Sequence, residues 1–260
     1  MHNKPPREQA HHYDIQWHRQ TGVFYPEQLS SETPTAGVSA NTWHEYMSLI
    51  RKAAADNPAH RFISPELMTT ADIELAEIPD QHAVVNDRLA ELQELSTSMP
   101  TAELVVGTPE YQPHSTYNSL MIITNGIRRV LERKRTIFSS AERGTFTASN
   151  TLQQRYTRTL SAVCADLVGY GVQYPELPQD TCAIHASCCW ATPLEERARY
   201  AAAPDEERYT SAMTHTLSNL FAHYPQLHQV MVVDRTPPST TIPPLNCVAR
   251  RSTHNGIIEP

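Results

Sequence analysis

Ser161-Ala-Val-Cys-Ala-Asp-Leu-Val168 is an apolar run that contains a cysteine followed by a small residue and an acid. The pattern predicts a strand that ends in a tight turn, with Cys164 held at the turn. A cysteine acts as a nucleophile only as the thiolate, so it needs a base, a cation or aimed backbone donors nearby. Those groups must come from other parts of the chain.

A glutamate follows a short predicted strand upstream. Phe62-Ile-Ser-Pro-Glu66 ends too abruptly for a helix, and Pro65 fits the end of a strand better than its middle. Glu66 is therefore expected at the carboxyl edge of a sheet, where open α/β sheets keep their sites.

A lysine ends a predicted hairpin. Residues 117–124 and 127–134 are apolar runs joined by Asn125-Gly126, which is the strongest short-range hairpin signal. This arrangement places Lys134 at the end of the second strand.

The remaining apolar patterns alternate between helical and strand spacing, which is typical of the α/β class. They predict helices over 41–57, 80–98 and 193–224, and strands over 102–108, 181–187, 228–233 and from 245 onward.

Residues 1–40 contain four prolines, several histidines and little periodicity. We predict a flexible or irregular N-terminal leader over 1–40, in which residues 13–17 are a candidate opening strand. Residues 41–260 are then a single domain, long enough to bury a substantial core.

Glu66, Lys134 and Cys164, in this order, resemble the Glu, Lys, Cys constellation of the nitrilase superfamily of carbon–nitrogen hydrolases. The resemblance covers roughly 43–260, and further motifs fall in the same order: Val105-Val-Gly107, Tyr117-Asn118-Ser119, Tyr174-Pro-Glu-Leu177 and Ser252-Thr-His-Asn-Gly256. It implies an α/β fold, a nitrilase-like four-layer αββα sandwich, and a homodimer.

The resemblance also implies a role for each residue. Cys164 would attack the carbonyl carbon, Glu66 would be the base, and Lys134 would stabilise the oxyanion together with the backbone N–H of Ala165. Glu142, eight residues after Lys134, would support the lysine. Three further residues are expected in the substrate pocket: Trp190, Tyr117 and Asn118.

The leading hypothesis is a thiol-dependent amidase that cleaves a linear amide without a cofactor. Amide is preferred to nitrile because Ala165-Asp166 stands where nitrile-cleaving members usually carry Trp-Glu. Two alternatives remain: acyl transfer to an amine by the same three residues, and a catalytically silent binding or assembly protein with the same fold.

A zinc site is the competing interpretation of His185, Cys188 and Cys189. Adjacent cysteines in a strand lack the usual spacing of zinc ligands, so core packing is favoured and no metal is predicted.

Charge and composition limit the classes of binding partner and the cellular compartment that we expect for this protein. The formal net charge is -7 and the basic residues are scattered, which argues against nucleic acid and anionic membrane surfaces. No apolar run approaches the roughly 18 residues that span a bilayer, and residues 1–20 are too polar for a signal peptide. Five cysteines without paired spacing favour a reducing compartment. We expect a cytoplasmic protein with a small-molecule amide substrate.

Overall fold

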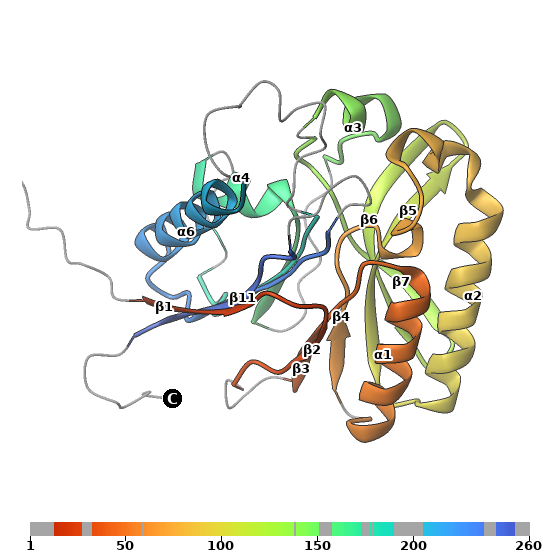
Figure 1. Cartoon of the computed structure of the whole chain (residues 1–260), viewed down its shortest axis with the longest axis horizontal. Helices are drawn as coiled ribbons and strands as arrows, with labels where there is room; N and C mark the ends of the chain where they lie inside the picture. Colours follow the sequence, from red (N-terminus) through yellow and green to blue (C-terminus); the bar gives the residue numbers. More distant parts are fainter. Residues whose placement is uncertain are drawn as a thin grey trace, which may run out of the picture.

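Two β-sheets lie face to face, with helices on their outer faces (Figure 1). The computed structural model describes residues 13–27, 33–58, 60–137, 139–150, 158–172, 177, 179–189, 205–236 and 243–252. The layers follow the order helix, sheet, sheet, helix, which confirms the predicted αββα sandwich.

One sheet has six strands in the order β2-β3-β4-β5-β6-β7. Their bounds are β2 (Gly22–Phe24), β3 (Thr35–Ser39), β4 (Arg61–Ile63), β5 (Glu103–Gln112), β6 (Ser115–Thr124) and β7 (Ile127–Arg133). The strands β3, β4 and β5 are parallel, and β6 and β7 form the predicted antiparallel hairpin. The predicted strand over 102–108 is confirmed and continues to Gln112.

Two crossover helices connect the parallel strands of this sheet: α1 (Trp43–Asp56) and α2 (His82–Ser98). Both confirm predicted helices. The side chain of Thr42 accepts the N–H of Glu45 at the start of α1, and the helix ends at Asn57. Apolar side chains of α1 and α2 pack on the outer face of the sheet, where they form one continuous core with it.

The second sheet has five strands in the order β1-β11-β10-β9-β8. Their bounds are β1 (Tyr13–His18), β8 (Thr159–Val163), β9 (Ala183–Ser187), β10 (Gln229–Val233) and β11 (Asn246–Arg251). Its outer face carries α4 (Ala165–Val172) and α6 (Asp205–His223). The predicted helix over 193–224 is confirmed from 205, and its first part lies outside the described residues.

A third apolar cluster fills the layer between the two sheets. Its members come from both inner faces, including Leu120 and Val105 from the larger sheet and Val163 and Met231 from the smaller one. This inner layer fixes how the ends of the two sheets face each other.

The described part of the predicted irregular leader over 1–40 contains the strands β1, β2 and β3, and β1 confirms the candidate strand over 13–17. β1 pairs with β11, which lies at the other end of the chain, and β3 is paired with β2 and β4. Such short strands carry little periodic signal, and their stability comes from partners far away in sequence.

Three short helices complete the described elements: the 3-10 helices η1 (Met68–Thr70) and η2 (Leu75–Asp80), and α3 (Ser140–Thr145). In the described ranges, no helix is both long and apolar enough to cross a membrane.

Candidate active site

Cys164 directly follows a buried strand, as predicted, and a helix that was not predicted begins at the next residue. Every residue of β8 is buried, α4 begins at Ala165, and Cys164 itself has a left-handed φ of 41°. Its N–H donates to the carbonyl of Ser187 at 2.9 Å, and its carbonyl accepts the N–H of Leu167 at 2.9 Å. The neighbouring strand and the helix therefore hold a backbone conformation that is strained for cysteine.

Glu66 lies in a sharp turn after β4, between the sheets and 2% exposed. Leu67 follows it with a left-handed φ of 53°. A glycine on β5 makes room for this turn, because a Cβ on Gly107 would lie 2.4 Å from the carbonyl oxygen of Pro65 and 2.8 Å from the Cα of Glu66. Gly107 is thus required by close approach of the backbone.

Lys134 directly follows β7, so the hairpin delivers it as predicted. Its N–H donates to the carbonyl of Asn118 at 2.7 Å, and its carbonyl accepts the N–H of Ser149 at 3.0 Å. Its side chain is 2% exposed and lies 2.7 Å from Oε1 of Glu66. A buried ammonium needs such partners because removal of a charge from water is costly.

Glu142 is the second carboxylate partner of Lys134, with a short ion pair between Nζ and Oε1. Its backbone N–H and its carboxylate also form a capping box with Ser139 at the start of α3. The same carboxylate therefore fixes α3 and contacts the lysine, as the predicted supporting role requires.

The Glu66 carboxylate accepts hydrogen bonds from an ammonium, a side-chain amide and a backbone N–H. Oε1 accepts from Lys134 Nζ and, at 2.6 Å, from Asn118 Nδ2, while Oε2 accepts from the N–H of Cys189 at 3.0 Å. An ionised carboxylate only accepts hydrogen bonds, and this environment suits that form.

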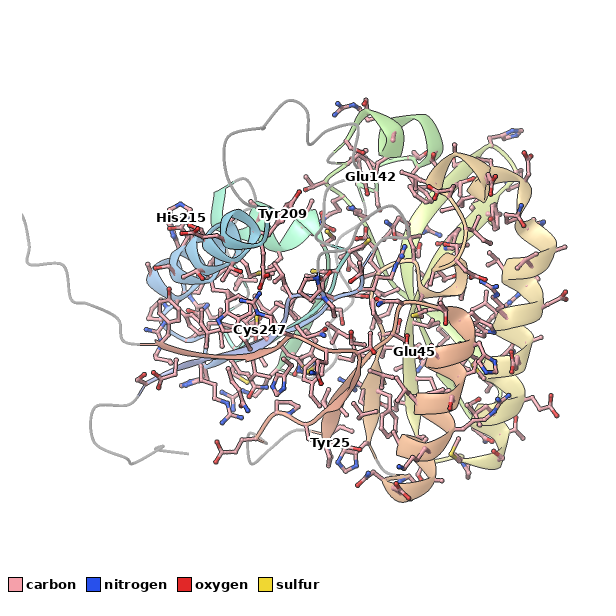
Figure 2. All side chains as sticks on the ribbon, viewed as in Figure 1. Tyr25, Glu45, Glu142, Tyr209, His215 and Cys247 are labelled. Atoms are coloured by element: carbon pink, nitrogen blue, oxygen red, sulfur yellow. The ribbon has the colours of Figure 1, made fainter. Side chains whose placement is uncertain are left out.

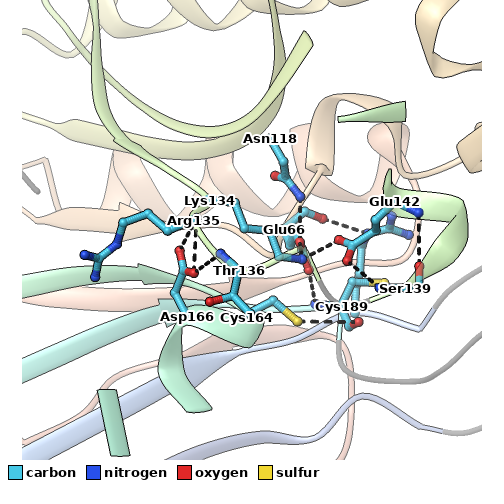
Figure 3. Close-up of polar contacts among 11 residues, drawn as sticks. Glu66, Asn118, Lys134, Arg135, Thr136, Ser139, Glu142, Cys164, Asp166 and Cys189 are labelled. Atoms are coloured by element: carbon cyan, nitrogen blue, oxygen red, sulfur yellow. Dashed lines mark hydrogen bonds and ion pairs between the residues drawn. The ribbon is translucent and has the colours of Figure 1, made fainter. Parts of the chain in front are cut away.

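The backbone of one residue, Cys189, contacts both the carboxylate and the thiol. The N–H of Cys189 donates to Glu66, and its carbonyl accepts from Sγ of Cys164 at 3.9 Å. Figure 3 shows Glu66, Lys134, Glu142 and Cys164 gathered around this position. The structure thus brings together the predicted Glu, Lys and Cys, which come from three separate strand ends and both sheets.

Opposing effects set the ionisation of Lys134. Burial lowers the pKa of Lys134, but the negative charges of Glu66 and Glu142 outweigh it and hold this pKa well above its usual range, and a Cys164 thiolate would raise it in the same direction. The lysine is therefore a permanent cation at neutral pH.

The thiol of Cys164 is neutral at rest. A hydrogen bond with the Cys188 thiol lowers the pKa of Cys164, and Lys134 lowers it too, but burial and the charges of Glu66 and Glu142 raise it by more. The net pKa is above the ordinary value, although Lys134 acts in the direction that favours the thiolate. A thiolate would form here only if a nearby base accepted the proton.

The predicted supporting residue Ala165 is the first residue of α4. The first N–H groups of a helix have no acceptor within it, so this N–H is suited to an oxyanion beside Cys164. Asn118 also belongs to the site, where it contacts Glu66. Trp190 lies outside the described residues.

Tyr117 does not join the site. It precedes Asn118 on β6, and successive residues of a strand point to opposite faces. The guanidinium of Arg133 lies 4.6 Å from the centre of its ring, beside the ion pair of Arg133 with Glu110. The prediction failed because a motif of adjacent residues was treated as one surface.

The groups considered for zinc point in different directions. Ser187 contacts the opposite sheet, so His185, two residues earlier, shares that inner face, whereas Cys188 packs in the outer core. Burial and the nearby Arg61 lower the pKa of His185 to about 3. Among the described residues, no three His, Cys, Asp or Glu side chains gather closely enough to hold a metal ion.

Comparisons with known proteins give no matching family model and no matching curated sequence. Solved structures do match. A carbon–nitrogen hydrolase from Helicobacter pylori G27 has a TM-score of 0.58 at 14% identity, over 88% of this chain and 80% of that one. An amidase mutant from Nesterenkonia sp. AN1, with acrylamide added to its active-site cysteine, has a TM-score of 0.55 at 12% identity, over 94% of both chains. The C-to-A mutant of the Nesterenkonia AN1 amidase, described as a nitrilase-superfamily member, has a TM-score of 0.53 at 12% identity, over 84% of this chain and 89% of that one. The sandwich that holds Glu66, Lys134 and Cys164 therefore has the fold of the nitrilase superfamily of carbon–nitrogen hydrolases.

Proposed function

We propose that this protein is a carbon–nitrogen hydrolase that cleaves a linear amide through a thioester on Cys164. The observation that carries the proposal is the backbone of Cys189, whose N–H donates to the Glu66 carboxylate and whose carbonyl accepts from the Cys164 thiol. A base and a nucleophile placed in this way, beside a buried cation, are the groups that acyl transfer requires.

The first half of the reaction forms the thioester. Glu66 takes the thiol proton as Sγ of Cys164 attacks the amide carbon, and the carbonyl oxygen becomes an oxyanion. The Lys134 ammonium and the N–H of Ala165 stabilise that charge. Glu66 then gives its proton to the leaving amine as the carbon–nitrogen bond breaks.

The second half consumes water. Glu66 removes a proton from the water molecule as its oxygen attacks the thioester, and the same cation stabilises the second oxyanion. The carbon–sulfur bond breaks, the thiol regains a proton from Glu66, and a carboxylic acid leaves.

The test is turnover of short primary amides, with acetamide and butyramide as probes and butyronitrile as the comparison, measured by ammonia release. We expect turnover of an amide that is absent in Cys164→Ala and falls by roughly 10² to 10³ in Lys134→Ala. Cys182→Ala is the matched control, because Cys182 is a buried cysteine outside the site.

The two alternative functions have their own outcomes. Acyl transfer is tested by product analysis with an added primary amine: N-acylated amine in place of the free acid as the main product supports acyl transfer, whereas mainly free acid supports hydrolysis. A chain with no turnover, whose Cys164 reacts with iodoacetamide no faster than Cys182 or Cys247, is a silent binding protein.

A further inference from the structure

Asp166 is a fully buried acid that the proposed reaction does not use. It is the second residue of α4, two positions after Cys164. Its Oδ1 accepts the N–H of Thr136 at 2.7 Å and that of Arg135 at 3.1 Å, while Oδ2 accepts the N–H of Arg135 at 3.0 Å (Figure 3). Charge-assisted bonds of this kind are stronger than neutral ones.

These bonds cross from one sheet to the other. Asp166 belongs to the helix that follows the nucleophile, whereas Arg135 and Thr136 directly follow Lys134. β7 ends at Arg133, so Arg135 and Thr136 lie beyond the end of that strand. The N–H of Lys134 is held by β6 of its own sheet. Asp166 attaches the other side of Lys134 to the helix of Cys164.

The negative charge of Asp166 affects the ionisation of a neighbouring buried acid, Glu132. Burial raises the pKa of Glu132, and the negative charge of Asp166 raises it further, to about 9. Glu132 therefore holds a proton at neutral pH while Asp166 accepts from two backbone donors. An acid in the first turn of a helix interacts favourably with the helix dipole even when it is exposed. That interaction alone explains neither the burial of Asp166 nor its bonds to residues 135 and 136.

We propose that Asp166 is a positioning residue that fixes the Lys134 ammonium relative to the Cys164 thiol. The inference rests on the proposed function, because the lysine matters there as the cation of the oxyanion. The Asp166 carboxylate accepts backbone N–H groups, and the proposed reaction uses none of its atoms. It acts through the backbone on either side of the gap between the sheets.

The test measures the rate at which iodoacetamide alkylates Cys164 as a function of pH, by peptide mapping of the full chain. It needs no substrate, so it remains informative if no amide is hydrolysed. Among the described residues, the titratable and charged groups that act on the thiol include Glu66 after β4, Lys134 after β7, Glu142 on α3, and the thiols of Cys188 and Cys189 after β9. Loss of Lys134 from its place raises the apparent pKa of Cys164, because the cation favours the thiolate.

The variants are Asp166→Asn, which keeps the shape of the side chain, and Asp166→Glu, which keeps its charge but moves it. We expect both to raise the apparent pKa of Cys164, by on the order of 1 unit, in the direction of Lys134→Ala. In the double variant Lys134→Ala, Asp166→Asn we expect no further change, because a residue that acts through the lysine has no effect without it.

The sign separates this mechanism from a simple charge effect. Removal of a nearby negative charge alone lowers a thiol pKa, and Asp234→Asn provides that control. Asp234 is also buried and holds a backbone N–H, that of Leu245 at 2.8 Å, but it has no bond to the lysine segment. Thermal unfolding identifies any variant that does not fold.

An unchanged or lowered pKa in both Asp166 variants overturns the proposal, and so does an additive shift in the double variant. With an amide substrate in hand, kcat and kcat/KM fall together in Asp166→Asn, by roughly 10-fold at unchanged KM. A shifted thiol profile without any turnover leaves the positioning role intact and rejects the proposed function instead.

Discussion

Asn118 Nδ2 and Lys134 Nζ converge on the same oxygen, Oε1 of Glu66, at 2.6 and 2.7 Å. The carboxylate is thereby held against the lysine, and its other oxygen is turned toward the Cys189 peptide on the opposite sheet. Asn118 therefore controls which way the proposed base points, although the sequence motif indicated a pocket residue.

Replacement of this amide by an acid tests its role. Asn118→Asp has the same shape but places a second carboxylate against Glu66, so one of the two holds a proton and Glu66 becomes a poorer base. We expect kcat to fall roughly 10- to 100-fold, in line with loss of a hydrogen bond to a charged group. Ser119→Ala, on the other face of β6, is the control. Equal activity of Asn118→Asp and wild type would contradict this role.

Gly107 tests the turn that carries Glu66. In Gly107→Ala the new methyl meets only backbone atoms, including the N of Leu67 at 2.6 Å, so the turn must move. We expect a loss of about 1 to 3 kcal/mol in the free energy of unfolding, measured in urea, together with reduced turnover. Gly144→Ala has no atom within 4 Å of its Cβ and lies in α3, so it is the matched control and gains up to about 1 kcal/mol.

Cys188 tests the electrostatics of the thiol. Its hydrogen bond lowers the pKa of Cys164, so Cys188→Ala raises that pKa and slows alkylation of Cys164 near pH 8. Cys188→Ser retains a hydroxyl donor and is expected to alkylate at least as fast as wild type. If the alanine and serine variants behaved alike, the two thiols would not be coupled.

Glu132 tests a buried acid beside the site. Its pKa is about 9 in the folded chain because of burial and the charge of Asp166, against 4.5 as the ordinary value. A raised folded pKa gives stability that is present below pH 4.5 and lost as pH rises toward 9. We expect Glu132→Gln to be more stable than wild type in urea at pH 8, by on the order of 1 to 3 kcal/mol, and the difference to vanish at pH 4. A constant difference at both pH values would show that its proton is not the cause.

The sequence predicted those parts of the site that depend on neighbours in the chain. The Asn125-Gly126 turn placed Lys134 at the end of its strand, and the apolar run before Cys164 placed the thiol at the turn that ends a strand. Both are local signals, because turn chemistry and side-chain alternation act over a few residues.

The contacts between the sheets could not be predicted in this way. The backbone of Cys189 contacts both Glu66 and Cys164, which lie about a hundred positions apart in the chain. Asp166 binds backbone N–H groups, and a backbone contact leaves no side-chain pattern in the sequence. β1 likewise depends on β11 at the far end of the sequence. The sequence shows that an acid follows Cys164 by two positions, but it does not show that this acid binds the N–H groups of Arg135 and Thr136.

The groups of the proposed reaction belong to different sheets. Cys164 follows a strand of the smaller sheet, and Glu66 and Lys134 follow strands of the larger one. Side chains of the inner layer, such as Leu120 and Val163, thus act as spacers that set the gap across which a proton must travel. Because packed interiors transmit small displacements, trimming one spacer by a methylene alters the reaction before it unfolds the chain. Hydrostatic pressure reduces that gap without a mutation. The dependence of the turnover rate on pressure therefore reports on the distance between the sheets.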